Sequence, residues 1–190
     1  MSTRVMTKKK RTARRARPGR PRRDRPVLPA SYSVPKGDRG MTAWEGARAM
    51  LERARGYWLA TIGAHGAPHV VQQWGAWVDD RWYFEGGAET AWARNLVREP
   101  RIVMSVERDT AVAIVEGRAA RVRSVPPEIA VRIATQYRAK YGRIFGYRPT
   151  PDEWEERGGF MLRPEKILAW DVRRFPASMT RFRFAADKET

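Results

Sequence analysis

Two neighbouring stretches hold the residues whose types could form a binding site. The first reads GYWLATIGAHGAPHVVQQWGAW, from Gly56 to Trp77, and predicts two β-strands joined by a tight turn, with paired glutamines and two tryptophans on the second strand. The second reads ETAWARNLVREP, from Glu89 to Pro100, and predicts a short helix that carries an Arg-Asn pair and ends at a proline. Amide, guanidinium and indole groups suit a binding cleft, but they also suit a well-packed barrel.

Side chains for catalysis without a cofactor are few. The sequence contains no HExxH, P-loop or GxSxG motif. His65 and His69 flank a turn. Such a pair could hold a metal or haem, but we prefer the interpretation that the two histidines simply lie at the end of a hairpin. Asp79 and Asp80 are read as turn residues. We therefore expect no metal site and assign no catalytic residue, so an enzyme built on this chain takes its chemistry from a cofactor.

The composition narrows the class of protein. The chain has 190 residues and no cysteine, which excludes disulfides and thiolate metal sites and fits a cytoplasmic protein. It contains no run of about 18 apolar residues, so we expect no membrane span. No apolar segment follows the basic N-terminus, and a secretory signal is not expected.

The positive charge is concentrated at the N-terminus. Residues 1–26 hold twelve arginines and lysines against one aspartate, which gives +11 of the total +17. Residues 1–40 have almost no large apolar side chains, so we expect a disordered tail before a single domain at 41–190. Gly19-Arg20-Pro21 resembles a minor-groove AT-hook, which suggests weak, nonspecific nucleic-acid contact through residues 1–26. A solubilising extension and an upstream start ahead of Met41 are the alternatives.

Periodicity and turn residues predict the elements of the domain. Thr42 and Glu45 have the spacing of a capping box for the first helix, which Gly56 ends. A loop is expected between Gly146 and Pro151, and two strands hinged near Pro164 follow it. The predicted helices cover 42–55, 89–99 and 126–142, and the predicted strands cover 57–64, 69–78, 81–86, 101–107, 111–125, 159–175 and 180–184. Strands in meander order with two or three helices indicate a small barrel rather than a βαβ sheet.

Three stretches carry a family resemblance. YWLATIGAHGAPHVVQQWGAWVDDRWYFEG, followed by ETAWARNLVREPRIVMSVE and VAIVEGRAARV, resembles the pyridoxamine 5'-phosphate oxidase-like superfamily, and within it the flavin- and deazaflavin-dependent oxidoreductases. The resemblance covers about residues 42–184. It implies an α+β fold, mainly antiparallel β: the FMN-binding split β-barrel with two or three flanking helices. It also implies a homodimer that holds a flavin-type ring in a cleft between subunits.

The resemblance assigns cofactor contacts to two elements. The ring is expected against the strand from Val70 to Trp74, and the phosphate at the start of the helix from Thr90 to Leu96. A helix N-terminus offers free N–H groups and a partial positive charge to an anion. The cofactor-binding residues implied in this way are Val71, Gln72, Gln73 and Trp74 on the strand and Thr90, Trp92, Arg94 and Asn95 on the helix.

The chain departs from the family pattern at the phosphate end. Relatives usually carry an arginine or lysine one or two places after the residue that matches Thr90, where this chain has Ala91 and Trp92. A doubly charged phosphate is then weakly neutralised, which favours the 8-hydroxy-5-deazaflavin coenzyme (F420) with its phosphodiester over FMN. On this basis Trp92→Lys is expected to tighten FMN binding. Three alternatives remain. Trp92 could stack on the ring, the helix and the tryptophans could serve only to pack the core, or the protein could have lost cofactor binding.

The function that follows is that of an oxidoreductase. It uses coenzyme F420 or FMN to pass a hydride to or from a small organic substrate, with a second copy of the chain as partner and no membrane. A split-barrel carrier of a cofactor or haem without catalysis, and a nucleic-acid-associated protein that acts through its basic tail, are the alternatives.

Overall fold

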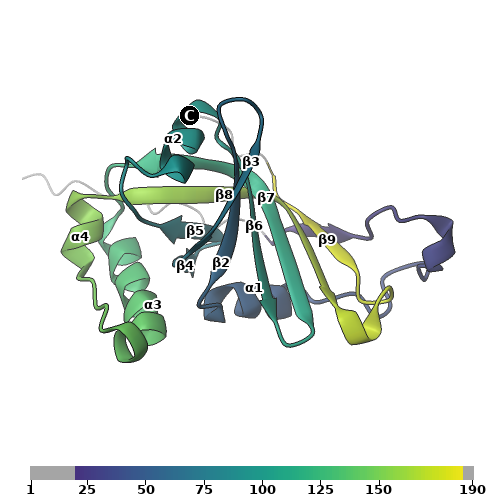
Figure 1. Cartoon of the computed structure of the whole chain (residues 1–190). Coiled ribbons are helices and arrows are strands. Elements are labelled where there is room, and N and C mark those ends of the chain that lie inside the picture. Colours follow the sequence, from purple (N-terminus) through teal and green to yellow (C-terminus); the bar gives the residue numbers. More distant parts are fainter. Residues whose placement is uncertain (1–19, 186–190) are drawn as a thin grey trace, which may run out of the picture.

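The computed structural model describes residues 20–185 and shows one twisted sheet with helices around it (Figure 1). Its strands are β1 Arg22–Asp24, β2 Tyr57–Ile62, β3 Pro68–Gln73, β4 Ala76–Val78, β5 Arg81–Phe84, β6 Arg101–Arg108, β7 Ala111–Val122, β8 Gly159–Asp171 and β9 Thr180–Arg183. Its α-helices are α1 Trp44–Arg53, α2 Ala91–Arg98, α3 Pro127–Phe145 and α4 Pro151–Glu156, and two 3₁₀ turns are η1 Ala30–Tyr32 and η2 Val172–Arg174.

The sheet is antiparallel and open. Its strands follow the order β1-β9-β8-β7-β6-β2-β3, while β4 pairs with β5 and β5 joins the sheet through β8. Every strand pair in the described part is antiparallel. The prediction of an α+β, mainly antiparallel split β-barrel is confirmed.

The long strand β8 produces the split. Its first half pairs with β5 through Phe160–Leu162, and its second half pairs with β9 through Lys166–Ala169. Pro164 lies between the halves, where it cannot donate to a ladder, and the register of β7 shifts opposite it at Gly117. A Cβ on Gly117 would lie 2.1 Å from the Arg163 carbonyl oxygen, so only glycine fits this close approach. The prediction of two strands over 159–175 was wrong: one strand changes partners at Pro164.

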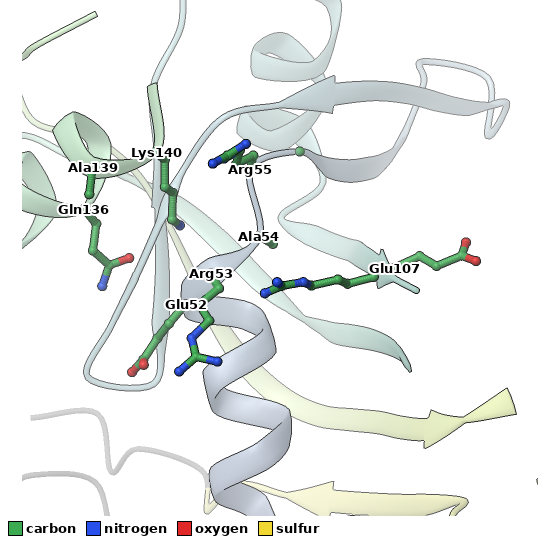
Figure 2. A pocket seen from close by; sticks show the side chains of 10 residues that line it. Glu52, Arg53, Ala54, Arg55, Glu107, Gln136, Ala139 and Lys140 are labelled. Atoms are coloured by element: carbon green, nitrogen blue, oxygen red, sulfur yellow. The ribbon is translucent and has the colours of Figure 1, made fainter. Parts of the chain in front are cut away.

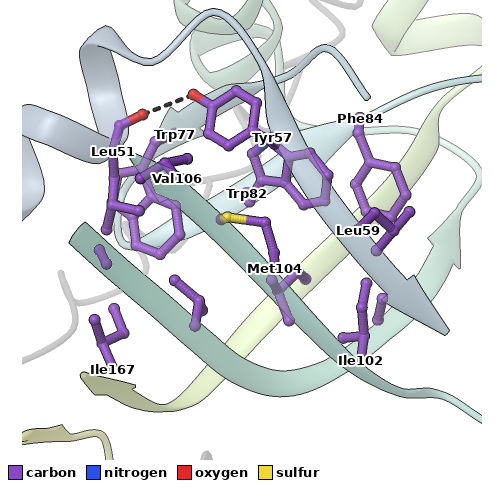
Figure 3. Packing of buried hydrophobic residues seen from close by; sticks show 14 of the residues in the cluster. Leu51, Tyr57, Leu59, Trp77, Trp82, Phe84, Ile102, Met104, Val106 and Ile167 are labelled. Atoms are coloured by element: carbon purple, nitrogen blue, oxygen red, sulfur yellow. Dashed lines mark hydrogen bonds between the residues drawn. The ribbon is translucent and has the colours of Figure 1, made fainter. Parts of the chain in front are cut away.

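Large apolar side chains fill the space enclosed by the sheet, α1 and α2. Figure 3 shows Trp77, Trp82 and Phe84 packed with Leu59 and Met104, all fully buried. Trp82 stacks on Phe84 with ring centroids 4.2 Å apart. The alternating burial of β2 and β6 supplies this core from one face of each strand, as the period of two predicts.

A second apolar cluster lies beneath α3 and α4. Ile133, Tyr137 and Tyr141 of α3 pack there with Trp154 of α4. The loop predicted before Gly159 instead contains α4, which Thr150 and Glu153 begin with a capping box. The sequence Thr-Pro-Asp-Glu has the pattern of a capping box, but Gly146, Pro149 and Pro151 favoured a loop in the prediction.

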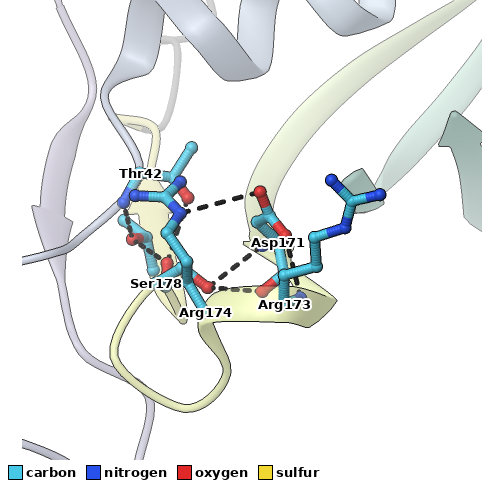
Figure 4. A network of polar contacts seen from close by, with 6 residues as sticks. Thr42, Asp171, Arg173, Arg174 and Ser178 are labelled. Carbon is cyan, nitrogen blue, oxygen red and sulfur yellow. Dashed lines mark hydrogen bonds and ion pairs between the residues drawn. The ribbon is translucent and has the colours of Figure 1, made fainter. Parts of the chain in front are cut away.

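The capping box predicted at Thr42 and Glu45 does not form. The N-cap of α1 is Ala43, with no side-chain hydrogen bond. Thr42 instead donates from Oγ1 to the Ser178 carbonyl oxygen at 3.0 Å, and the Ser178 hydroxyl donates to the Asp171 carbonyl oxygen at 2.9 Å (Figure 4). This network fastens the start of α1 to the turn between β8 and β9, a partner that local spacing could not reveal.

The second half of the predicted disordered tail has a defined place. We call residues 20–40 the N-terminal strap, because β1 pairs with β9 at the sheet edge. Arg25 donates hydrogen bonds to the carbonyl oxygens of Gly37, Arg39, Ala177 and Met179. Asp24 accepts from Arg181 at 2.6 Å, and this bond lowers the pKa of the Asp24 carboxyl. For residues 20–40 the expectation of disorder was wrong, because arginine bonds and strand pairing replace an apolar core. Residues 1–19 lie outside the described residues.

Within residues 20–185, no helix is both long and apolar enough to cross a membrane.

Candidate functional site

The N-terminus of α2 presents unpaired backbone donors. Thr90 is its N-cap, with no side-chain capping bond, and the first intrahelical bond runs from the Arg94 N–H to the Thr90 carbonyl oxygen. The N–H groups of residues 91–93 therefore have no partner among residues 20–185. An uncapped helix start of this kind attracts an anion, as the sequence predicts for this helix.

The predicted donors at this end are turned toward the preceding loop. The Thr90 hydroxyl donates to the Gly87 carbonyl oxygen at 2.8 Å, and the Arg94 guanidinium donates to the Glu89 carbonyl oxygen. The Glu89 carboxylate lies over Gly87, 2.0 Å from the position that a Cβ there would take. One guanidinium and one carboxylate thus flank the helix start, so its fixed side-chain charge is close to zero.

Trp92 is a core residue. Its side chain is 4% exposed, and its ring lies 5.0 Å from Phe160 and 5.5 Å from Phe84, centroid to centroid. The indole also approaches Gly86, where a Cβ would lie 2.6 Å from Trp92 Cζ2. Trp92 therefore forms the floor beneath the loop that leads into α2, and it does not project from the helix surface.

Asn95 is buried and structural. Its Nδ2 donates to the Thr61 hydroxyl at 3.0 Å, and its Oδ1 accepts from Arg98 at 3.1 Å. Arg98 also donates to the Ile62 carbonyl oxygen at 2.9 Å. These bonds hold α2 against the end of β2, and the Asn95 side chain does not point toward the helix start.

The predicted ring strand divides its residues between two faces. Val71 packs against the main core, and the Gln73 amide nitrogen lies 3.5 Å from the Cβ position of Gly86, beside the loop that leads into α2. Gln72 points to the other face, where it is exposed and lies opposite Trp58 of β2. Within one chain, β3 therefore brings Gln73, but not Gln72, toward α2.

Trp74 follows the end of β3 and faces α3. Its ring stacks on Tyr141 with centroids 4.6 Å apart and planes 9° apart, and Phe145 lies 4.7 Å away. The strand predicted over 69–78 is broken here, because β3 ends at Gln73 and β4 begins at Ala76. The structure thus gathers Gln73, Thr90 and Arg94 near the start of α2, with Trp92 below them, and places Trp74 elsewhere.

Sequence reasoning missed a buried lysine, Lys140 of α3. Its side chain is 7% exposed, and Nζ donates to the Tyr57 hydroxyl at 2.7 Å and to the Gly75 carbonyl oxygen at 2.9 Å. The helical period could have predicted its burial, since Lys140 follows Ile133 and Tyr137 on the apolar stripe of the helix. Burial lowers the pKa of Lys140 to about 7, and the Glu52 carboxylate opposes part of this shift.

This lysine predicts a rise in stability with pH. The folded state loses the Lys140 proton at a pKa of about 7, whereas an unfolded lysine keeps it to about 10.4, so the unfolded chain binds more protons in between. The contribution of Lys140 to the free energy of unfolding should therefore rise by about 2 kcal/mol from pH 7 to pH 9. Denaturant unfolding at both pH values should show the rise in the native protein and not in Lys140→Met. Equal pH slopes in the two proteins would contradict this assignment.

Burial also shifts the pKa of Glu85, which is paired with Tyr147 near the loop before α2. Tyr147 donates a hydrogen bond to the Glu85 carboxylate. Burial raises the pKa of Glu85, although the Tyr147 bond opposes the shift.

His65 and His69 lie at the β2–β3 hairpin, and within residues 20–185 no group of three or more His, Cys, Asp or Glu side chains is arranged to hold a metal ion.

Known proteins share this architecture. The sequence model of the pyridoxamine 5'-phosphate oxidase family matches residues 43–171. Among solved structures, a conserved hypothetical protein from Mycobacterium tuberculosis is 22% identical, with a TM-score of 0.55 over 74% of this chain and 92% of that one. A pyridoxamine 5'-phosphate oxidase-related, FMN-binding protein from Nostoc punctiforme is 18% identical, with a TM-score of 0.52 over 79% and 94% of the two chains. No curated protein matches. At these identities the structural likeness concerns the fold.

Proposed function

Since the chain belongs to the pyridoxamine 5'-phosphate oxidase family, we propose that it is an oxidoreductase that binds coenzyme F420 or FMN and passes a hydride to or from a small organic substrate. The observation that carries the proposal is the uncapped start of α2, whose free N–H groups lie beside the loop that Gln73 also approaches. The cofactor supplies the hydride chemistry when it is bound. The protein binds its anionic end, orients its ring and excludes water.

The residues present fit a cofactor with one negative charge at this end. Three backbone N–H groups and the Arg94 guanidinium can accept an anion, while the Glu89 carboxylate opposes it. A phosphodiester carries one charge and a terminal phosphate monoester carries nearly two at neutral pH. The balance of charges therefore favours the deazaflavin coenzyme over FMN.

Two substitutions at the helix start should change affinity in opposite directions. Arg94→Ala removes the cation and should weaken binding of either cofactor by about one decade or more, as for the loss of a charge-assisted hydrogen bond. Glu89→Gln removes the opposing carboxylate and should tighten binding, more strongly for FMN because it carries the larger charge. Titration by tryptophan fluorescence quenching measures both effects.

Matched variants separate charge from loop structure. Arg94→Lys keeps the charge and should retain most of the affinity, while Val97→Ala, at an exposed position on the same helix, should change nothing. If neither Arg94→Ala nor Glu89→Gln alters the affinity for either cofactor, the start of α2 is not the anion site.

We also propose that two copies of the chain associate through an exposed apolar face. On the outer side of β2, β3 and β6, Ala60 pairs with both Val70 and Val103, and Trp58 lies two residues before it. Trp58 is 52% exposed and Val70 is 58% exposed, and apolar side chains exposed together on one face of a sheet are typical of a contact surface. Gln72 lies on this face, so a cofactor held between subunits could reach it.

Light scattering at micromolar concentration should give the mass of a dimer. Trp58→Glu places a charge in the apolar face and should shift the protein to monomer, whereas Val131→Glu, on the exposed side of α3, should not. A mass of 21.9 kDa for the native protein would refute the dimer and remove half of the proposed cleft.

A further inference from the structure

A pocket of about 630 Å³ lies beside Lys140, apart from the start of α2. It is bordered by the end of α1 and the following residues 54–56, the end of β6, and α3. Figure 2 shows Lys140 reaching from α3 toward the segment that leaves α1 and carries Arg53 and Arg55. Gln136 of α3 also borders the pocket, with its amide bonded to the backbone of Trp77. Since α2 leads into the start of β6, the pocket lies at the far end of this strand from α2, about 24 Å along its eight residues.

Two hydrogen bonds account for both hydrogens of a neutral Lys140 amine. Tyr57 donates its only hydroxyl hydrogen to the Leu51 carbonyl oxygen at 2.6 Å, so its oxygen must accept from Lys140 Nζ. The Gly75 carbonyl oxygen can only accept, and it takes a second hydrogen from Nζ at 2.9 Å. A neutral amine thus has both hydrogens bonded and one lone pair without a described partner. The protein holds the nucleophilic form of this lysine without leaving any of its hydrogens unpaired.

The pocket carries a surplus of positive charge. The guanidinium groups of Arg53, Arg55 and Arg108 line it and have no ion-pair or hydrogen-bond partner among residues 20–185. Of the two acids, Glu52 is paired with Arg48 at 3.6 Å, and Figure 2 shows the Glu107 carboxylate pointing away from Lys140. A small anion is the ligand that this lining recognises.

We propose that Lys140 is a carbonyl-reactive amine and that its pocket takes a small anionic aldehyde or keto acid, which it binds covalently as an imine. The unpaired arginines hold the anionic group, and the lone pair of Nζ adds to the carbonyl carbon. The carbon–oxygen bond of the adduct then breaks. The two amine hydrogens leave with that oxygen as water, and no redox partner is needed. A proton from solvent restores one N–H, for which the Gly75 carbonyl and Tyr57 hydroxyl oxygens are in place.

The groups that face the amine support this chemistry. Burial keeps the pKa of Lys140 near 7, so about half of the amine is neutral at that pH, against less than about 0.1% for an ordinary lysine. Glu52 of α1 is the acid that opposes this effect. Burial raises the pKa values of Tyr57 of β2 and Tyr141 of α3, so both phenols stay protonated and add no negative charge.

Reductive trapping with glyoxylate tests the proposal in the full-length native protein. Glyoxylate and cyanoborohydride at pH 7 should carboxymethylate Lys140 at least about tenfold faster than Lys36 or Lys166, measured by peptide mass spectrometry, because its neutral fraction is far larger. Lys36 is exposed, and Lys166 is paired with Glu116, so each reports ordinary lysine reactivity. Labelling of Lys140 at or below their rate would overturn the proposal.

Two further arms test the lone pair and the arginines. Lowering the pH from 7 to 5.5 should slow labelling of Lys140 more than tenfold, as its amine becomes protonated. Arg55→Gln should slow trapping of glyoxylate several-fold and leave trapping of uncharged acetaldehyde unchanged; equal effects on both aldehydes would contradict anion recognition by this residue. The comparison of lysines within one protein needs no variant at Lys140, so a folding defect cannot obscure it.

Discussion

Replacing Trp92 by lysine is expected to destabilise the protein strongly rather than to create a phosphate site. The indole is buried between Phe84 and Phe160, and lysine there leaves a cavity and brings an ammonium group toward an apolar floor. Large-to-small changes of a buried tryptophan alone cost about 3–5 kcal/mol, and partial burial of the charge adds to this. Thermal unfolding should show a midpoint lower by about 6–20 °C, so we no longer expect this variant to tighten FMN binding.

The neighbouring position provides the matched control. Ala91 is exposed in the first turn of α2, one place after Thr90. Ala91→Lys should keep the midpoint within a few degrees and tighten FMN more than the deazaflavin coenzyme, because it adds a cation beside the free N–H groups. A Trp92→Lys protein that melts like the native one would show that this side chain can leave the core.

Removing residues 1–40 is expected to destabilise the protein, in contrast to removal of residues 1–19. The N-terminal strap adds β1 to the edge of β9, and Arg25 bonds four carbonyl oxygens from two separate segments. We expect a chain that starts at Met41 to lose about 3 kcal/mol, which lowers the melting midpoint by roughly 6–12 °C. Dispensability of the whole segment, expected from its lack of apolar side chains, is thereby replaced by a role at the sheet edge.

Two single substitutions locate this effect. Arg25→Met should reproduce most of the loss, whereas Arg22→Met should be silent, since the Arg22 side chain is exposed and has no described contact. Equal midpoints for chains that start at Arg20 and at Met41 would mean that the strap contributes nothing to stability.

The elements themselves follow closely from the sequence. Thr90 and Pro100 bracket α2, and the alternation in β2 and β6 identifies the faces that form the core. These features depend on backbone preferences and on periodicity within a few residues, which is why the family resemblance and the split-barrel fold could be predicted. The start of α2 at Thr90 was predictable for the same reason. The missing capping bond was not, because threonine at this place often caps a helix, whereas here the Thr90 hydroxyl bonds the Gly87 carbonyl oxygen.

Contacts between distant segments were decided by the tertiary structure. Thr42 has a capping-box spacing, but its partner is Ser178, 136 residues away. The helical period places Lys140 on an apolar stripe, yet only the approach of Tyr57 and Gly75 gives its amine acceptors and removes water from it. The family pattern marks Trp92 as a place for a cation, but Phe84 and Phe160 draw its ring inward. A sequence fixes which face of an element is apolar, whereas burial and charge at one atom depend on what the rest of the chain brings against that face.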